Sequence, residues 1–221
     1  PRMRPPVLEH AHVPLGGDGG RPAGDGGRVS PLAPPGEYTV RLTVAGEELT
    51  RSLIVLKDPH STGTEADIRA QFRVILELRE EAEAVVDLIN EAEIIRAQLD
   101  DMEAYGRLPV GQDGAEIRAA ATALDEALIE LEMGLTDLRL SGGSAGQDAL
   151  RWPRQLFAKI TSLAGYVGSS DFRPTDQHLE VHQRYKELLA DAQARMEEIR
   201  MGELAELNRI LPMAWELFPG G

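Results

Sequence analysis

The sequence has 221 residues, enough for one good-sized domain or for one domain and a small appendage. Its net charge of −14 makes nucleic acid and anionic membranes unexpected partners, because binding to phosphates depends on Lys and Arg. The absence of cysteine excludes disulfides, thiol nucleophiles and Cys-ligated zinc, and no apolar run reaches the roughly 18 residues that a membrane span needs. Aromatic residues make up only 5% of the chain, and Leu, Ala and Ile supply most of the apolar side chains, which favours helices over sheets.

Residues 1–36 are dominated by Pro and Gly, with Asp-Gly repeats at 16–20 and 24–27. Such a segment buries too little apolar surface to offset the entropy lost on ordering, so we expect it to be flexible. The repeats lack the regular ligand spacing of a calcium loop. The first residues contain neither an initiator Met nor the apolar core of a signal peptide, which leads us to expect a start within a longer chain.

Residues 37–57 have the pattern of a β-hairpin. The even-numbered residues from Tyr38 to Val44 are apolar and would share one face of a first strand. A turn at 45–48 precedes a second run, 49–56, that contains several β-branched residues. A lone hairpin is only marginally stable in water, so we expect it to pack either on the helices that follow or on strands outside this chain.

A first helix is predicted from Thr64 to about Tyr105, because no Gly or Pro interrupts this segment. Thr64 is a suitable N-cap, and Glu65 and Asp67 suit the positive end of the helix dipole. At 1.5 Å per residue the helix is roughly 60 Å long, so it needs long partners. Its apolar positions recur about every 3.4 residues, close to the coiled-coil period. They are Ile68, Phe72, Ile75, Leu78, Ala82, Val85, Ile89, Ala92, Ile95, Leu99 and Met102.

A second helix is predicted after the loop 106–114, with Asp113 and Glu116 as a capping box. Its apolar seam repeats in a regular heptad pattern and ends at the Gly-rich run 141–146. The seam consists of Ile117, Ala121, Leu124, Leu128, Leu131, Leu135 and Leu138.

Two further helices complete the pattern. The third is short and is predicted to begin with Pro153 at its first position. The fourth is capped by Thr175 and continues to the C-terminal tail, residues 212–221, with a weak point or bend at Gly202. The apolar face of the third helix is Leu156, Phe157, Ile160, Leu163, Ala164 and Val167, and that of the fourth is Leu179, His182, Tyr185, Leu189, Ala192, Met196 and Ile199, continuing through Leu204, Leu207 and Leu211.

These elements predict a mainly α fold, in which an N-terminal β-hairpin precedes a long antiparallel bundle of three to four helices over residues 64–211. Short connectors favour antiparallel neighbours. The predicted lengths place the first and fourth helices along the whole bundle, with the second and third sharing the remaining groove.

No residue is predicted to be catalytic or to bind a cofactor or a metal. Neighbouring carboxylates such as Glu80–Glu81 point about 100° apart on a helix, so they do not face one substrate cleft as a hydrolase pair does. We expect them on solvated helix faces. His178 and His182 have a zinc-compatible i, i+4 spacing. A metalloprotease helix reads H-E-x-x-H, whereas this segment reads HLEVH, with the glutamate one position later, and no third ligand is evident. His10 and His12 lie in the Pro/Gly-rich segment without further ligands. Nucleophile elbows, phosphate loops and dinucleotide fingerprints do not occur.

The most distinctive local string runs from Gly165 to His178 and has two interpretations. In the structural one, Gly168 ends a helix, and side chains of the following turn brace it before the next helix begins. In the functional one, the same turn is a recognition loop at one end of the bundle. The candidate residues for either role are Asp171, Arg173, Thr175, Asp176 and His178.

Four ordered strings resemble a known family. Residues 33–44, APPGEYTVRLTV, resemble the final strands of an FlgD-like, immunoglobulin-type domain. The following Lys57-Asp58-Pro59 and the later strings 150–153 and 168–177 are similar to the C-terminal region of bacterial sortilin-like (VPS10-type) BNR-repeat proteins, which are often labelled glycosyl hydrolases. The resemblance covers roughly residues 30–212 and implies an incomplete Ig-like domain before the bundle.

The resemblance also implies a β-propeller upstream, where any hydrolase activity or ligand binding would reside, so no family catalytic residue can be assigned here. We therefore expect a non-catalytic C-terminal structural or interaction module. Its partners would be the propeller of the same parent protein, another protein, or a second copy through an exposed helical seam. The alternative is an accessory part of a glycoside hydrolase or peptidase, whose cleft the 171–178 loop would cover. Export to the periplasm or outside the cell is expected from the resemblance alone.

Overall fold

The computed structural model describes residues 29–104, 112–139, 152–211 and Leu217. It confirms the mainly α fold with an N-terminal hairpin. Most of the predicted flexible segment 1–36, the residues His10 and His12, and most of the tail 212–221 lie outside the described residues. The elements are β1 (Gly36–Val44), β2 (Glu47–Val55), α1 (Glu65–Ala104), α2 (Gln112–Leu135), α4 (Leu156–Val167), α5 (Asp176–Ile199), the π-helical turn η1 (Arg200–Leu204) and α6 (Ala205–Ile210).

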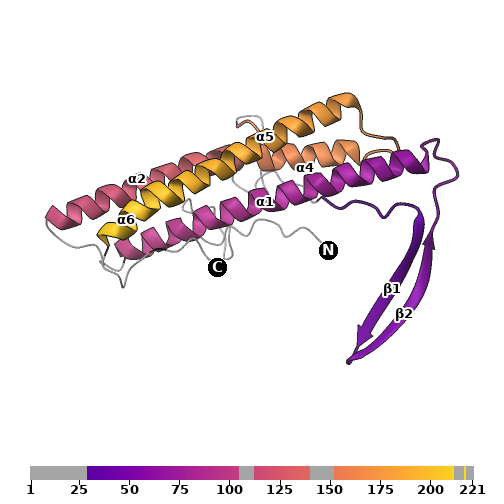
Figure 1. Ribbon diagram of the computed structural model, residues 1–221, viewed down its shortest axis with the longest axis horizontal. Helices are drawn as coiled ribbons and strands as arrows, with labels where there is room; N and C mark the ends of the chain where they lie inside the picture. The colour runs from indigo at the N-terminus through magenta and orange to yellow at the C-terminus, as the bar shows by residue number, and fades with distance from the viewer. Residues whose placement is uncertain (1–28, 105–111, 140–151, 212–216, 218–221) are drawn as a thin grey trace.

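Two continuous rods and one interrupted rod form the bundle (Figure 1). α1 runs along its whole length, and α5, η1 and α6 form a second rod in the same direction. α2 and α4 follow one another in the opposite direction, and both contact α1 and α5. The predicted arrangement, with two short helices sharing the groove between two long ones, is confirmed.

The core lies along the predicted stripes. On α1, every predicted apolar position from Ile75 to Met102 is buried. On α2, the seam is buried except for Ala121, which is half-buried. All six predicted apolar positions of α4 are buried. Burial of these stripes supplies the main stabilising free energy of the bundle.

Two predicted helix boundaries are wrong. α2 ends at Leu135, so Leu138 is buried in a non-helical segment rather than on the helix. α4 begins at Leu156 with Gln155 in an extended conformation as its N-cap, so Pro153 precedes the helix instead of opening it. The first error arises because apolar spacing continues to Leu138 beyond the last helical turn, and the second because a proline that suits a first helical position lies before the helix. The side chain of Asp113, half of the predicted capping box, lies outside the described residues.

The rod that begins with α5 departs from regular geometry where the sequence predicts a weak point. Gly202 lies in the middle of η1, whose π-helical hydrogen bonding interrupts the α-helix. The bundle stripe of α5 starts at His182, because Leu179 is 44% exposed. At the other end, the amide side chain of Asn208 donates to the carbonyl of Leu217 (3.0 Å) and accepts from its N–H (2.8 Å), which holds buried Leu217 beside α6.

The bundle contains a charged cluster that the apolar pattern does not reveal. The side chain of Arg96 on α1 is 1% exposed. Its Nε donates to Asp125 of α2 (2.9 Å) and its Nη1 donates to Glu132 of α2 (2.9 Å), while Glu93 lies 3.6 Å from Nη1. A buried arginine is tolerated because carboxylates face it, and this requirement selects one pairing of α1 with α2.

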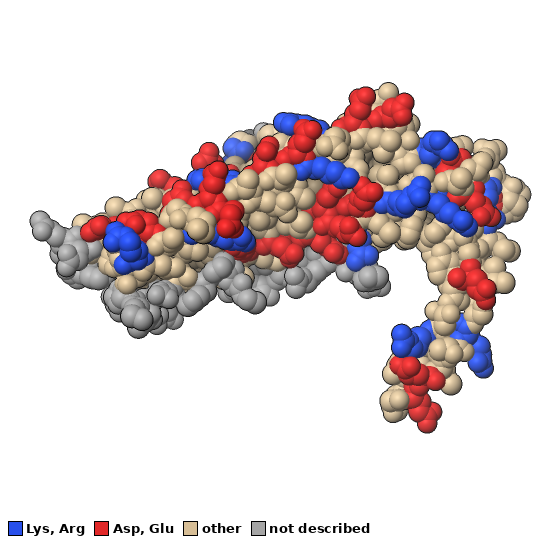
Figure 2. Space-filling view, viewed as in Figure 1, with Lys and Arg blue, Asp and Glu red and all other residues tan. Residues whose placement is uncertain are grey.

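The surface of the bundle carries charges of both signs. Figure 2 shows acidic side chains along its visible face with basic ones between them. Some of these basic groups join helices. For example, Arg200 makes a two-pronged contact with Glu91 of α1 at 2.5 and 2.6 Å. Among the described helices, none has the length and apolar character to cross a lipid bilayer.

Arg96→Ala should lower the free energy of unfolding by about 3–5 kcal/mol, because it removes the cation that faces buried carboxylates. Urea denaturation at pH 7 measures this change. The matched control is Arg184→Ala, which removes an exposed arginine paired with Glu187 and should cost under about 1 kcal/mol. Equal losses in the two variants would contradict a special role for the buried cluster.

Candidate interaction site at the hairpin and the bundle end

The hairpin is regular over its whole length. β1 and β2 pair antiparallel from Gly36 opposite Val55 to Val44 opposite Glu47. The turn is Ala45–Gly46 alone, with φ angles of +52° and +88°, as in a type I′ turn. The second strand therefore begins at Glu47, two residues before the predicted start, because a two-residue I′ turn matches the twist of the strands.

The register places most of the apolar side chains on one face of the hairpin, which also carries Arg51 and Glu47, and most of the polar ones on the other, which also carries Ile54. The polar face includes Thr39, Thr50 and the pair Ser52–Glu37, joined by a 2.6 Å hydrogen bond. Residues on the apolar face are about half exposed: Val40 48%, Leu42 55%, Val44 58%, Leu49 59% and Leu53 49%. An apolar face left in water is typical of a surface that binds another protein.

The hairpin stands away from the bundle (Figure 1). Arg69 of α1 donates to the carbonyl of Pro35 at its root (3.3 Å), but every residue from 39 to 54 is exposed. The Tyr38 hydroxyl donates to the carbonyl of Pro34 (2.5 Å) and fixes the start of β1. Of the two packings expected for the hairpin, packing on the bundle is therefore not observed.

The connector between α4 and α5 lies beside the start of α1. The side-chain amide of Gln71 on α1 donates to the carbonyls of Val167 (2.8 Å) and Ser170. Arg173 Nε donates to Asp67 Oδ1 (2.7 Å). Two side chains of α1 and one of the connector thus hold this end of the bundle together.

The structure gives three of the five candidate residues defined partners. Besides Arg173, Thr175 and His178 form a reciprocal cap, in which the His178 N–H donates to Thr175 Oγ1 (3.2 Å) and the Thr175 N–H donates to His178 Nδ1 (3.4 Å). Asp176 is exposed in the first turn of α5. Asp171 is half-buried, and its backbone lies so close to Gly63 that a Cβ at position 63 would overlap the Asp171 carbonyl.

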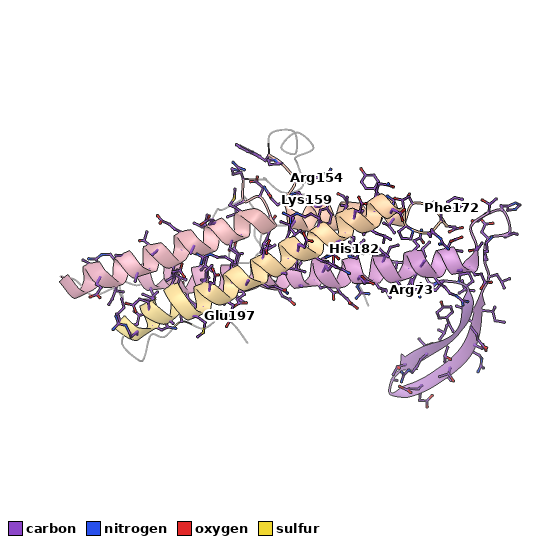
Figure 3. The ribbon with its side chains drawn as sticks, turned by 45° about the horizontal axis from the view of Figure 1, so that its top comes forward. Arg73, Arg154, Lys159, Phe172, His182 and Glu197 are labelled. Atoms are coloured by element: carbon purple, nitrogen blue, oxygen red, sulfur yellow. The ribbon has the colours of Figure 1, made fainter. Side chains whose placement is uncertain are left out.

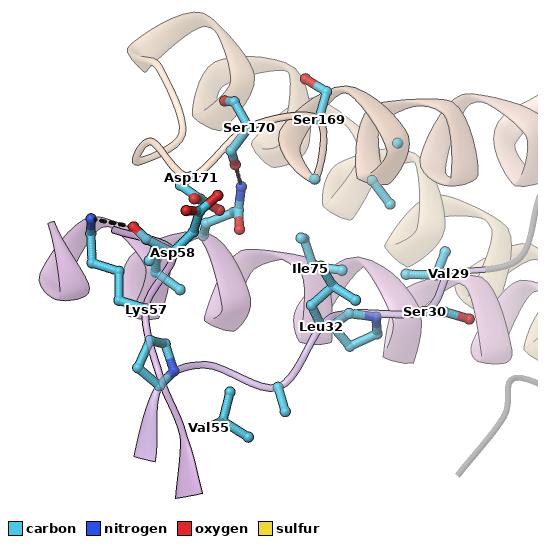
Figure 4. A pocket seen from close by; sticks show the side chains of 18 of the residues that line it. Val29, Ser30, Leu32, Val55, Lys57, Asp58, Ile75, Ser169, Ser170 and Asp171 are labelled. Carbon is cyan, nitrogen blue, oxygen red and sulfur yellow. Dashed lines mark hydrogen bonds between the residues drawn. The ribbon is translucent and has the colours of Figure 1, made fainter. Parts of the chain in front are cut away.

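A cavity of about 740 Å³ lies between the hairpin root and the bundle end. Figure 4 shows Ile75 and Leu32 on one side of it, with Lys57, Asp58 and Asp171 at its polar edge. Lys57 is held by backbone carbonyls, including that of Asp58 at 3.1 Å. The cavity has apolar walls and a mixed-charge edge, at which Lys57 and Asp58 are engaged with the chain itself.

Asp67 joins two parts of this end. It accepts hydrogen bonds from the hydroxyl of Thr64 (2.6 Å) and from Arg173. These bonds, the Thr64 hydroxyl first, lower its pKa from 3.8 to about 2. The sequence indicated Asp67 as a favourable helix-dipole charge, whereas its pairing with Arg173, 106 residues away, and the role of Gln71 had no local signal.

Gly63→Ala should destabilise the protein by about 1–3 kcal/mol, because the added methyl group must push the Asp171 backbone away from α1. Thermal and urea unfolding measure the loss. Gly165→Ala is the matched control, since a Cβ there meets no atom within 4 Å and an alanine favours α4 by up to about 1 kcal/mol. A neutral Gly63→Ala would show that this contact is not tight in solution.

The Asp67 carboxylate stabilises the fold above its unfolded pKa of 3.8, and this contribution should be lost as the pH falls towards 2. Arg173→Gln should raise the Asp67 pKa only part of the way, because the Thr64 hydrogen bonds remain. NMR titration of the Asp67 carboxyl carbon measures the change. Arg184→Gln serves as the control and should leave that pKa unchanged, whereas a similar rise there would refute the assigned partner.

Comparison with protein-family models, with curated proteins and with solved structures finds no match to this chain. Any function proposed for it therefore rests on its own residues. At this end of the molecule, the connector is committed to internal contacts, while the hairpin presents an apolar face without a described partner.

Proposed function

We propose that the chain is a non-catalytic structural and interaction module, in which the bundle is a rigid arm and the hairpin is its binding element. One observation carries the proposal: the hairpin has an exposed, mainly apolar face opposite a mainly polar one. A two-stranded hairpin alone is only marginally stable in water. Its alternation of apolar and polar residues is typical of strands that pack one face on a core.

The partner that suits this face is the rest of an Ig-like β-sandwich. In such a sandwich, one face of each sheet is apolar and packs on the other sheet about 10 Å away. The Tyr38–Pro34 hydrogen bond supports this proposal, because Ig-like domains commonly contain a tyrosine whose hydroxyl bonds to the backbone a few residues upstream. Tyr38 also lies in the string that resembles the last strands of an FlgD-like domain.

The larger setting that we propose follows the same resemblance: a sortilin-like BNR-repeat protein whose propeller precedes the Ig-like domain. The alternative, a loop at 171–178 that covers a hydrolase cleft, has weaker support. Arg173, Thr175 and His178 bond to groups of their own bundle end, which is the behaviour of bracing residues.

The gene upstream of Pro1 should encode Ig-like strands. In a longer chain that includes those strands, the backbone amides of the hairpin should be protected from hydrogen exchange. In the present chain alone, the same amides should exchange rapidly while α1 stays protected. Leu42→Lys with Leu53→Lys should abolish the protection in the longer chain, because two charges would enter the sheet interface. The thermal stability of the bundle should stay the same, since neither residue packs on it.

Thr39→Lys with Thr50→Lys is the matched control, because it adds the same charges on the opposite, polar face of the same strands. This variant should keep the protection. Equal loss with both double variants, or an initiator codon directly before Pro1, would refute the proposed sandwich.

A further inference from the structure

Four charged or titratable side chains meet between α1 and α5. Glu77 and Glu81 lie one turn apart on α1, and His182 and Lys186 lie one turn apart on α5. His182 Nε2 is 2.7 Å from Glu81 Oε1, and Lys186 Nζ donates to Glu77 Oε2 at 2.6 Å. Figure 3 shows His182 between the ribbons of the two helices.

The cluster is buried on one side and open on the other. The side chain of His182 is 4% exposed and that of Glu81 11%, whereas that of Glu77 is 48% exposed. The second oxygen of Glu81, Oε2, is buried and has no hydrogen-bond partner in the structure. A buried carboxylate oxygen without a partner is costly, and a bound ion is one of the ordinary explanations for it.

We propose that Glu77, Glu81 and His182 form a binding site for a divalent transition-metal ion, with Zn²⁺ as the reference ion. One ligand atom from each residue lies within 4.8 Å of the others. Ligand bonds of about 2.0–2.2 Å require the ligand atoms to lie roughly 3.4 Å apart, so these side chains must turn when the ion enters. The imidazole favours zinc and its neighbours over calcium and magnesium, and three protein ligands leave a further position for water.

Lys186 is the internal competitor of this ion. Its ammonium group lies 2.6 Å from Glu77 and 4.0 Å from Glu81, where it neutralises the carboxylates that the metal would bind. Its side chain is 41% exposed, so it can turn into solvent when the metal enters. The ion would then join α1 to α5 in place of the Lys186–Glu77 pair.

This site differs from the one that histidine spacing suggests. His178 and His182 have the i, i+4 spacing of a two-histidine site, but His178 Nδ1 accepts from the Thr175 N–H in the helix cap. The other two ligands of the proposed ion come instead from α1, about 100 residues before His182 in the chain. A search restricted to spacing within one helix cannot find them.

Zinc titration of the full chain against a chromophoric chelator tests the proposal, with Co²⁺ absorption as a second readout of the ligand set. The wild type should bind one zinc at this site, and His182→Gln and Glu77→Gln should each lower the affinity about a hundredfold. Lys186→Met should raise it about tenfold. Zinc at a hundred times Kd should raise the Tm of the wild type by about 5–10 °C, because it binds only the folded bundle.

His178→Asn is the matched control for His182→Gln, and His10→Asn with His12→Asn removes the other histidine pair. Both should keep the affinity of the wild type. Glu77 is half exposed, so Glu77→Gln tests the site even if His182→Gln impairs folding, which circular dichroism would reveal. No zinc bound at micromolar concentration, or unchanged affinity in Glu77→Gln, would overturn the proposal. The hairpin takes no part in this site, so either proposal can fail without the other.

Discussion

An amphipathic helix of 40 residues buries its apolar stripe only if partners cover it along its whole length, and this constraint organises the molecule. Neither α2 nor α4 is long enough by itself, so the two lie end to end against α1, and α5 to α6 closes the opposite side. The interruption between α2 and α4 follows from that division. The hairpin, attached to the start of α1, lies at the far end, where none of the described helices covers it.

Heptad seams alone do not fix how two such helices pair, because a shift of seven residues brings apolar positions together again. Asp125 and Glu132 are seven residues apart on α2, and Arg96 donates to both. A slip by one heptad would remove one of these carboxylates from Arg96, which is 1% exposed. We infer that the buried charges contribute mainly to the specificity of pairing, since burying an ion pair adds little net stability.

The features that could be predicted from the sequence are those that local periodicity determines. The spacing of Ile75 to Met102 and the cap at Thr175 each involve neighbours along one helix, so they could be predicted well. Arg96 with Glu132, Arg173 with Asp67, and His182 with Glu81 depend on which helix lies opposite, and no single pattern encodes that choice. The helix ends near Leu135 and Pro153 were misplaced because local signals continue beyond the helices: buried Leu138 keeps the heptad spacing after α2 ends, and Pro153, which suits a first helical position, lies before α4 begins.

The hairpin shows the same limit in a more informative form. Its alternation correctly predicts two strands with one apolar face, but alternation cannot say what covers that face. The free hairpin would lose little by having polar residues at Leu42 or Leu53, because both are about half exposed. In a sandwich, the same positions would be buried, and their apolar character would stabilise the interface. The contacts of Gln71 and Arg173 hold the bundle end from which the hairpin projects, so a partner bound to the hairpin would sit at a defined end of a stiff arm.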